Sequence, residues 1–390
     1  MNNISIGFDK EKCCGCSACM AICGHKAISL EYDEQGFLYP VINEDNCVDC
    51  GLCVKVCPEN DLKQIPLDIC YAARRKDRQK LLSSTSGGFA AALSEKVLAQ
   101  DGVVYGVAYD SFPHVATLRK DTAEGLEQLK GSKYVQTDPQ NSFREVADDL
   151  KKGFEVCYTS TSCHVNGLLN YLKLRKIDTE HLVTIDLVCH GVPSPRLFEE
   201  YISWLSDKRE IINYQFRTKI KGWGGGSVNF FPSISYKNNK TYNSAKDWGY
   251  IKLFFSNCCL RPHCYHCPYA GKGRAADFTI ADYWDVEKVF PDFFTPDGVS
   301  LVFVNTEHGK KLMAELGDEL ELRQSKFGMG MDRQANLKHP SSKSPDYDQF
   351  WKDYQHGGIE LVARKYGGVT WQNQLKKNIK SILQRIGILK

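Results

Sequence analysis

The stretch CCGCSACMAIC, residues 13–23, places five cysteines within eleven residues. A cysteine group of this density can form a disulfide knot, a zinc site or a loop that binds an iron–sulfur cluster. Zinc sites and 4Fe-4S clusters both take four ligands, so one of the five cysteines is in excess. The decision between these sites depends on where the remaining cysteines of the chain lie.

A second stretch, CVDCGLCVKVC at residues 47–57, repeats the pattern of the first. Its four cysteines each follow a counterpart by 34 positions, and both stretches have the spacing C-x2-C-x2-C-x3-C. In this spacing three cysteines hold one 4Fe-4S cluster and the fourth ligates the other cluster. A pair of zinc sites is the alternative, although zinc does not require the doubled run. We therefore expect a first cluster on Cys13, Cys16, Cys19 and Cys57, and a second cluster on Cys23, Cys47, Cys50 and Cys53.

Residues 1–65 resemble the bacterial two-cluster ferredoxin domain, which implies an α+β ferredoxin-like fold for this region. Cys14 lies outside the repeated frame and is predicted not to be a ligand. Gly24 stands where the family usually has proline after the fourth cysteine, whereas Pro58 keeps that proline in the second half. Proline presets the first turn of a helix, so its absence weakens the first half locally without removing a ligand.

Composition describes an ordinary globular chain with an unusual number of cysteines. Of 390 residues, 42% are hydrophobic and 25% are charged, and the net charge is +3, which gives no electrostatic argument for nucleic-acid binding. The chain shows no signal peptide and no run of 18 apolar residues, so we expect a soluble cytoplasmic protein. In a reducing cytosol, 17 cysteines are expected to be metal ligands or catalytic thiols and not disulfides.

A second body begins after the short polar segment NDLKQIP, residues 60–66. Apolar runs at 103–109, 154–159 and 182–190 are rich in β-branched residues and predict strands. Helical patterns lie around them at 88–100, 142–153 and 165–176. The alternation predicts an α/β domain with a mainly parallel sheet, in which ligands bind near the carboxyl ends of the strands.

Three polar features follow these predicted strands and helices. The loop SSTSGGF, residues 83–89, precedes a helix and suits a phosphate, although it is also typical of a serine-rich helix cap. In GSKY, residues 131–134, Lys133 is either a phosphate ligand or a surface charge. In TSCH, residues 161–164, Cys163 is a structural thiol, a ligand or a redox thiol.

Residues from about 70 to 310 resemble the family of coenzyme F420 hydrogenase/dehydrogenase beta subunits. The resemblance is carried, in collinear order, by SSTSGGF, GVVYGVAY, LKGSKYVQTD, TIDLVCHGVPSP, FRTKIKGW, CLRPHCYHCPYA and GVSLVFVNTEHG. It implies an iron–sulfur flavoprotein that passes electrons between 4Fe-4S clusters, FAD and a small-molecule substrate or coenzyme. The domains expected are a ferredoxin domain (1–65), a region with the FAD loops (66–178), a cysteine-rich region with a third cluster motif (179–345) and a C-terminal tail (346–390).

The resemblance also implies site residues. FAD would be held by Ser84, Ser86, Gly87, Gly88, Lys133 and Tyr134. A third 4Fe-4S cluster would take Cys259, Cys264 and Cys267, with Cys189 as the fourth ligand and Cys163 as the alternative to Cys189. A zinc knuckle is the other interpretation of this group, and Cys258 is not expected to be a ligand.

Two motifs depart from the family. Residues 160–164 replace Gly-Thr-Pro-Cys-Gln, and residues 281–285 replace Gly-Asp-Phe-Trp-Gly. Both departures fall in motifs that we expect near the flavin or the substrate, so the sequence leaves the substrate open. The family also has members in organisms without the deazaflavin coenzyme, some of them among genes for surface-polysaccharide synthesis. That synthesis is one predicted setting, and the family name does not establish that this chain uses coenzyme F420.

The expected mechanism is a relay from the two ferredoxin clusters to the third cluster, FAD and the substrate. Arg217, Lys219 and Lys221, with Trp223, form a basic segment that is either a site for an acidic substrate or an exposed hairpin. His164 and His190 each follow a cysteine and are candidates for proton transfer, because histidine titrates near neutral pH.

The C-terminal segment 371–390 has a basic amphipathic pattern, which is typical of a helix that covers the protein's own core or lies on an anionic membrane. Three functions follow from the sequence as a whole. The first is an iron–sulfur flavin-dependent oxidoreductase. The second is an electron-transfer subunit that serves a catalytic partner or a ferredoxin, and the third is a redox sensor that has clusters but no flavin.

Overall fold

The computed structural model describes residues 9–206, 210–223, 231–237, 241–242, 248–271, 273–329 and 331–369. The amphipathic pattern predicted at 371–390 lies outside the described residues. Within the described part of the chain, no helix is long and apolar enough to cross a membrane.

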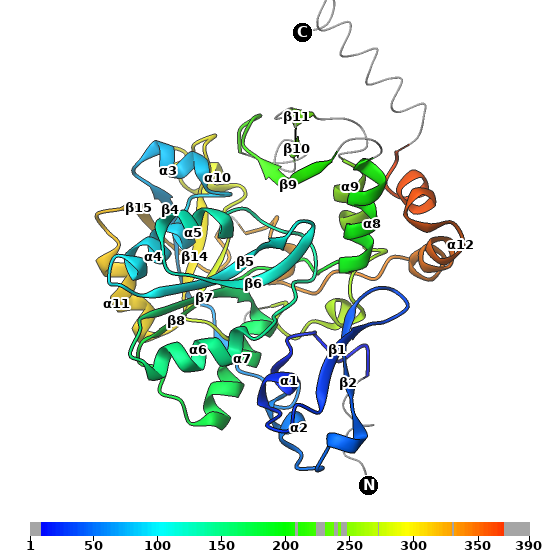
Figure 1. Cartoon of the computed structure of the whole chain (residues 1–390). Coiled ribbons are helices and arrows are strands. Elements are labelled where there is room, and N and C mark those ends of the chain that lie inside the picture. The colour runs from blue at the N-terminus through cyan, green and yellow to red at the C-terminus, as the bar shows by residue number, and fades with distance from the viewer. Residues whose placement is uncertain are drawn as a thin grey trace, which may run out of the picture.

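An eight-stranded sheet forms the centre of the molecule, with helices on both faces (Figure 1). Its strand order is β15-β4-β14-β13-β8-β7-β5-β6. In chain order these strands are β4 (Ile69–Arg75), β5 (Val103–Ser111), β6 (His114–Lys120), β7 (Val156–Thr161), β8 (Leu182–Leu187), β13 (Phe278–Asp282), β14 (Ser300–Val304) and β15 (Leu320–Lys326).

The sheet is mixed with a parallel core, so the predicted parallel pairing holds for its centre. The neighbours β5, β7, β8 and β13 pair in parallel, whereas β6, β14, β4 and β15 join antiparallel. The three predicted strands are all in the parallel centre, where helices lie between successive parallel strands. Of the antiparallel strands, β6 forms a hairpin with β5, β4 opens the second body, and β14 and β15 come from the later part of the chain; no strand was predicted at these positions.

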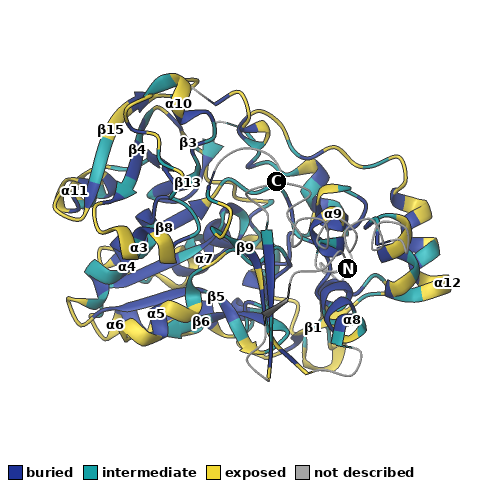
Figure 2. Cartoon of the chain, turned by 90° about the horizontal axis from the view of Figure 1, so that it is seen from above, coloured by how far each residue is buried: buried dark blue, intermediate teal, exposed yellow. Residues whose placement is uncertain are grey.

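Side chains alternate between the two faces of the central strands. Val103 and Tyr105 of β5 pack with α6 (Ser142–Lys151) and α7 (Ser162–Arg175), whereas Val104 packs with α4 (Phe89–Leu98) on the opposite face. The face of α4 also carries α5 (Ala123–Leu129) and α11 (Glu307–Glu315). Figure 2 shows the central strands buried and exposed positions gathered on outer helices such as α6, α11 and α12 (Tyr347–Lys365).

The N-terminal domain is small and packs against α7 (Figure 1). It consists of α1 (Ala18–Ile22), β1 (Ile28–Tyr32), β2 (Leu38–Ile42) and α2 (Leu52–Val56), with β1 and β2 paired antiparallel. Gly167 of α7 lies against Cys16, because a Cβ atom at Gly167 would be 2.9 Å from the Cys16 Sγ. Asn166 and Asn170 of α7 donate hydrogen bonds to the Asp61 carbonyl, both at 3.0 Å, and fix the chain that leaves this domain.

An aromatic core joins the remaining elements on the side of β6. Its helices are α8 (Pro195–Ser206), α9 (Gly249–Phe255) and α12, and they pack with β2 and with a small sheet. That sheet contains β9 (Ile211–Thr218), β10 (Phe231–Tyr236) and β11 (Thr241–Tyr242). The shorter elements are α3 (Arg78–Ser83), α10 (Val286–Val289), the pair β3 (Ile65–Pro66) and β12 (Gly273–Arg274), and the 3-10 turns η1 (Glu44–Asn46), η3 (Pro262–His266) and η4 (Ala335–Leu337).

Candidate functional site

The outer group of thiols in the N-terminal domain surrounds a hollow. This hollow is lined by Cys23, Cys47, Cys50 and Cys53, which are the four ligands predicted for the second cluster. Cys23 ends α1, Cys53 lies in α2, and the loop between Cys47 and Gly51 closes the hollow. Cys50 is exposed, so this group lies at the molecular surface.

The inner group consists of Cys13, Cys16, Cys19 and Cys57, the ligands predicted for the first cluster. Burial raises the pKa of the Cys19 thiol, and negative charge on Cys13 and Cys57 would raise this pKa further. Burial also raises the pKa of Cys57 to about 11, with Cys13 again a neighbour. Cys16 has Cys19 and Cys57 among its electrostatic neighbours, so the structure brings the four predicted thiols together.

A third group of thiols lies on the other side of the first turn of α7. Cys163 is in that turn, Cys189 follows β8, Cys264 lies in η3 and Cys267 ends η3. Burial raises the pKa of Cys189 to about 12, and Cys163 and Cys267 contribute to the rise. The pKa of Cys264 is raised well above its usual value by burial and then by Cys189, Cys267 and Cys163. These four thiols are therefore mutual neighbours.

Cys259, predicted from the sequence as a ligand of the third cluster, lies apart from these four thiols. Its Sγ donates a hydrogen bond to the Leu253 carbonyl at 3.3 Å, and its side chain is fully buried in the aromatic core. Burial raises the pKa of Cys259, and the thiol that adds to this rise is its chain neighbour Cys258. Cys163 and Cys189, treated as alternatives from the sequence, both lie beside Cys264 and Cys267.

Cys14 connects the inner and third groups. It is 7% exposed and contacts both Cys16 and Cys163. The spacing of the cysteines predicted only that Cys14 is no ligand. Its place between two groups depends on the packing of α7 against the N-terminal domain, which the cysteine spacing does not contain.

The four outer thiols line one hollow at the surface of the N-terminal domain. A zinc site needs four ligands at about 2.0–2.3 Å from a single point. Four thiols around a hollow, each available as a thiolate once iron displaces its proton, suit an inorganic cubane.

The SSTSGGF loop connects α3 to α4 and packs tightly against the sheet. Ser86 Oγ donates to the Val299 carbonyl at 2.9 Å, and the Gly87 amide donates to Ser300 Oγ at 2.9 Å. A Cβ atom at Gly87 would collide with the Ala73 carbonyl oxygen. Gly88 has φ +85°, a conformation that glycine adopts readily. The glycines therefore serve the close approach of the loop to β4 and β14.

Three lysines border this loop. Lys219 Nζ donates to the Leu81 and Ser86 carbonyls, both at 2.7 Å, and Lys130 Nζ donates to Ser83 Oγ at 3.3 Å. Lys133 Nζ donates to the Lys130 carbonyl at 2.8 Å, at the end of α5. Burial lowers the pKa of Lys219 to about 8 and that of Lys133 to about 7. Both lysines donate to main-chain carbonyls here, and Asp282 and Asp297 are the acidic groups that act on Lys219.

The predicted basic segment 217–223 is partly buried, with Trp223 buried and Ile220 and Lys221 exposed. Arg217 pairs with Asp282 at 2.7 Å and donates to the Tyr134 hydroxyl at 3.4 Å. Trp223 Nε1 donates to the same Asp282 carboxylate at 2.8 Å. Lys221 alone of the predicted basic residues is exposed. Lys219 of this segment thus contacts Ser86 of the SSTSGGF loop, and Arg217 contacts Tyr134.

The two candidate histidines are enclosed by protein. His164 is buried in α7, and burial lowers its pKa to about 4. His190 Nε2 lies 2.7 Å from Asn257 Oδ1, and burial also lowers its pKa. Both rings are therefore expected to be neutral at pH 7, which favours a structural role over proton donation.

Sequence reasoning missed Arg261, which lies between Cys259 and Cys264 in the motif CLRPHC. Its side chain is fully buried and reaches Cys13 of the inner group. A basic residue inside a cysteine motif was the only signal available in the sequence, and it did not indicate a contact with a residue 248 positions away.

Comparison with known proteins agrees with both resemblances. Residues 154–327 match the family described as the C terminus of the coenzyme F420 hydrogenase/dehydrogenase beta subunit, and residues 12–60 match the "4Fe-4S dicluster domain". A subunit of the F(420)H(2) dehydrogenase of Methanosarcina mazei is 23% identical over 372 residues, which cover 84% of this chain and 91% of that protein. Ferredoxin-3 of a Nostoc species is 30% identical over 75 residues, which cover 16% of this chain and 77% of that ferredoxin.

Among solved structures, the chain is similar to one in the F420-reducing [NiFe] hydrogenase complex from Methanosarcina barkeri. The TM-score is 0.44 at 17% identity, and the match covers 77% of this chain and 91% of the other. The two family matches, together with the dehydrogenase match along most of the chain, confirm the resemblances predicted from the sequence. Residues 154–327 thus match the C-terminal family of coenzyme F420 hydrogenase/dehydrogenase beta subunits, and residues 12–60 carry a 4Fe-4S dicluster domain.

Proposed function

We propose that the chain is an iron–sulfur flavin-dependent oxidoreductase that holds three 4Fe-4S clusters and FAD and acts on a small molecule. The redox role and the dicluster domain follow from the family. The third cluster, the flavin and the order of electron transfer are the proposal. The observation that carries it is the contact of Cys14 with Cys16 on one side and Cys163 on the other, which joins three thiol groups into one series.

The ligand sets of this proposal follow the three groups of neighbouring thiols. The first and second clusters keep the ligands predicted from the sequence. The third cluster takes one thiol from the start of α7, one that follows β8 and two from η3 and its end. The proposed third set is Cys163, Cys189, Cys264 and Cys267.

The exposure of the thiols supports an order for the series. Cys50 of the outer group is exposed, and Val48 beside it is 57% exposed, so an external electron donor or acceptor can approach this group. Cys16 of the inner group is 7% exposed and is covered by α7. The proposed route therefore begins at the outer group, passes the inner group and ends at the third group.

A flavin in this protein would exchange the one-electron chemistry of clusters for the two-electron chemistry of small molecules. Its candidate position is beside the SSTSGGF loop, where the partly buried lysines Lys133 and Lys219 donate to main-chain carbonyls and would be held in the charged form by a phosphate. The diphosphate of FAD would supply this negative charge. Tyr134 and Arg217 border the same side and would contact the rest of the cofactor.

Anaerobic purification with quantitation of iron, sulfide and flavin tests this proposal. Three cubanes correspond to about twelve irons per chain, whereas the dicluster domain alone corresponds to about eight. We expect about twelve irons and one FAD. A content of about eight irons per chain would exclude the third cluster. Clusters without bound flavin after reconstitution would favour the redox sensor.

The flavin position is tested by a matched pair of substitutions. We expect Lys219→Met to weaken FAD binding about 10-fold to 100-fold, because a hydrogen bond to a charged group contributes about 1.5–3 kcal/mol. Lys221→Met removes an exposed lysine from the same segment and should leave the FAD dissociation constant unchanged. Equal affinities in the two variants, measured by fluorescence titration of flavin, would place the cofactor elsewhere.

A second function, an electron-transfer subunit that serves a separate catalytic partner, is favoured by the exposed outer group and its apolar rim at Val48 and Leu52. The name of the Methanosarcina mazei relative also describes a subunit. Turnover of a small-molecule acceptor by the isolated chain would support the enzyme, whereas reduction of artificial dyes alone would support the electron-transfer subunit. The predicted setting in surface-polysaccharide synthesis stays a prediction, and so does any use of coenzyme F420.

A further inference from the structure

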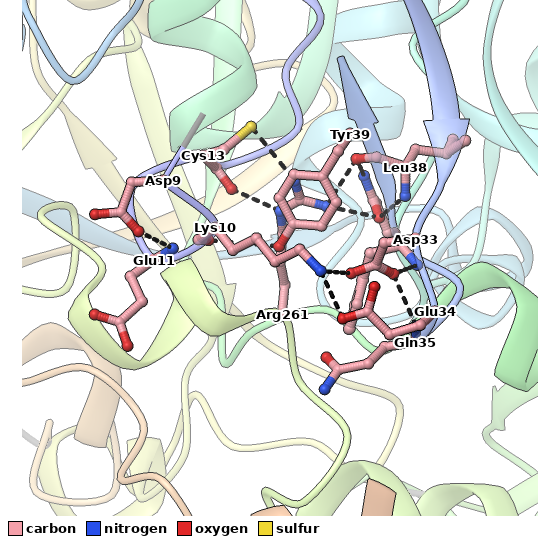
Figure 3. A network of polar contacts seen from close by, with 12 residues as sticks. Asp9, Lys10, Glu11, Cys13, Asp33, Glu34, Gln35, Leu38, Tyr39 and Arg261 are labelled. Carbon is pink, nitrogen blue, oxygen red and sulfur yellow. Dashed lines mark hydrogen bonds and ion pairs between the residues drawn. The ribbon is translucent and has the colours of Figure 1, made fainter. Parts of the chain in front are cut away.

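Arg261 is a fully buried arginine between the N-terminal domain and the third thiol group. In Figure 3 its guanidinium lies between Cys13 and Leu38, beside the ring of Tyr39. The distance from the guanidinium carbon to the centre of the Tyr39 ring is 3.9 Å. The residue belongs to the loop before η3, so its side chain crosses from one region of the molecule to another.

The contacts of Arg261 converge on one proposed cluster ligand. Nε donates to the Cys13 carbonyl at 2.7 Å, and Nη2 lies 3.4 Å from the Cys13 Sγ. Nη1 donates to the Leu38 carbonyl at 3.0 Å and to Gln136 Oε1 at 3.1 Å. All these partners are neutral groups except the thiol sulfur, which becomes a thiolate when it ligates iron.

No carboxylate neutralises this cation within the described ranges of the chain. The ion pairs found there join other arginines, such as Arg217 and Arg74, to acidic residues, and none includes Arg261. A buried charge is costly unless an opposite charge accompanies it. The other ionisable groups that act on Arg261 are Cys13, Cys14 and Tyr39. A cluster bound by four thiolates carries net negative charge and would provide the missing partner.

We propose that Arg261 is the charge partner of the first 4Fe-4S cluster and raises the reduction potential of that cluster. Reduction adds one electron, so a fixed positive charge beside the cluster stabilises the reduced form more than the oxidised form. A hydrogen bond to a ligand sulfur acts in the same direction, because net charge and hydrogen bonds to sulfur both set cluster potentials. This inference rests on the proposed assignment of Cys13 to the first cluster.

The backbone of Arg261 adds a second connection. The Cys264 amide donates to the Arg261 carbonyl at 2.9 Å, and the Arg261 amide donates to the Val192 carbonyl at 2.9 Å. The side chain therefore contacts a thiol of the inner group while the main chain holds a thiol of the third group. Arg261 acts as a positioning residue for both groups and as a charge for one of them.

Redox titration of the full-length reconstituted protein, followed by electron paramagnetic resonance, tests the proposal with Arg261→Gln and Arg261→Lys. We expect Arg261→Gln to lower the ratio of reduced to oxidised first cluster about tenfold at a fixed potential, which corresponds to a midpoint about 59 mV more negative. Arg261→Lys keeps the positive charge and should restore most of the shift. If Arg261 had only a structural role, the positive charge of lysine in Arg261→Lys would not restore the midpoint potential.

Arg144→Gln is the matched control. Arg144 donates only to the main-chain carbonyls of Met20, Ala21 and Cys23, so this substitution removes a cation beside the same domain without touching a sulfur. We expect Arg144→Gln to leave unchanged the midpoint potential that Arg261→Gln shifts. Iron-replete Arg261→Gln with all midpoints unchanged would overturn the proposal.

Gln136→Glu gives a measurement that keeps Arg261 in place. A carboxylate at this position would pair with Nη1 and neutralise the guanidinium, so the same midpoint should become more negative. Gln136→Met removes the contact without adding charge and should shift that midpoint less. If Arg261→Gln fails to retain iron, this pair decides the proposal, and equal midpoints in the two variants would overturn it. Loss of the underlying cluster assignment is distinguished by wild-type iron content below about eight per chain.

Discussion

Cys14 and Cys23 lie in the same short stretch of sequence but face different groups of thiols. Cys14 is buried between Cys16 and Cys163, whereas Cys23 lines the outer hollow with Cys47, Cys50 and Cys53. The chain direction changes after α1, and this change carries Cys23 away from the inner group. At the scale of single residues, the neighbours of a thiol therefore indicate its role better than its distance along the sequence.

We expect Cys23→Ser to lose about four irons per chain, because the second cluster loses one of its four ligands. Cys14→Ser should keep all the iron, since Cys14 belongs to none of the proposed ligand sets. Iron and sulfide analysis of both variants checks this prediction. Iron loss in Cys14→Ser equal to that in Cys23→Ser would make Cys14 a ligand.

A second pair of cysteine variants separates the third cluster from the aromatic core. We expect Cys264→Ser to lose about four irons. Cys259→Ala should keep the iron content and lower the free energy of unfolding by about 1–2 kcal/mol, because it removes a buried thiol from a packed core. Iron analysis and chemical denaturation distinguish the two effects. Loss of iron in Cys259→Ala would return that residue to the ligand set.

Helix α7 is the element that holds the cofactor regions together. Its first turn carries Cys163, its buried face includes Gly167 against Cys16, and Asn166 and Asn170 hold the Asp61 carbonyl. A helix of 14 residues thus contacts two thiol groups and the segment that leaves the N-terminal domain. Any shift of this helix should change the distance between the inner and third groups.

We expect Gly167→Val to lower stability by about 1–3 kcal/mol, because it adds volume to a packed interface. The Cβ atom of a residue introduced there would lie 2.9 Å from the Cys16 Sγ, so the iron content of the first cluster should fall as well. Gly24→Ala is the control in the N-terminal domain, because a Cβ atom at Gly24 has no atom within 4 Å. Chemical denaturation with iron analysis would show equal behaviour of the two variants if the contact were unimportant.

At the scale of the whole molecule, the sequence predicted the repeated thiol pattern, the family and the central strands. Spacing alone was enough for Cys23 to be assigned to the outer group, because the doubled run has one known arrangement of ligands. Cys259 was predicted to be a ligand because C-x4-C-x2-C resembles a ligand run, and nothing in the sequence indicated that this cysteine packs into the aromatic core.

Long-range contacts explain what the sequence did not predict. The pairing of Arg217 with Asp282 and the reach of Arg261 to Cys13 join segments far apart in the chain. The antiparallel strands β14, β4 and β15 pair across similar separations, so local periodicity does not indicate their neighbours. Each of these features depends on how the units pack, and a single sequence contains no direct signal for it.

If cluster binding stabilises the N-terminal domain, the resistance of the chain to proteolysis depends on iron. Removal of iron should increase the rate of trypsin cleavage at Lys55 and Lys63, because cluster binding contributes free energy to the folding of such domains. Both lysines are exposed, and the Lys63 amide donates to Asn166 Oδ1 at 2.6 Å. Reconstitution with iron and sulfide should restore the slower rate, and identical rates with and without iron would contradict the prediction.

Cys50 is exposed and Cys16 is buried, and this difference bears on how the proposed clusters react with oxygen. Among the proposed ligands in the described part of the chain, Cys50 is the most accessible to oxygen, because the thiols of the inner and third groups are buried or of intermediate exposure. Damage should therefore begin at the outermost cubane and spare the inner ones at first. The same burial of the inner and third groups should slow electron transfer from the inner clusters to oxidants in solvent.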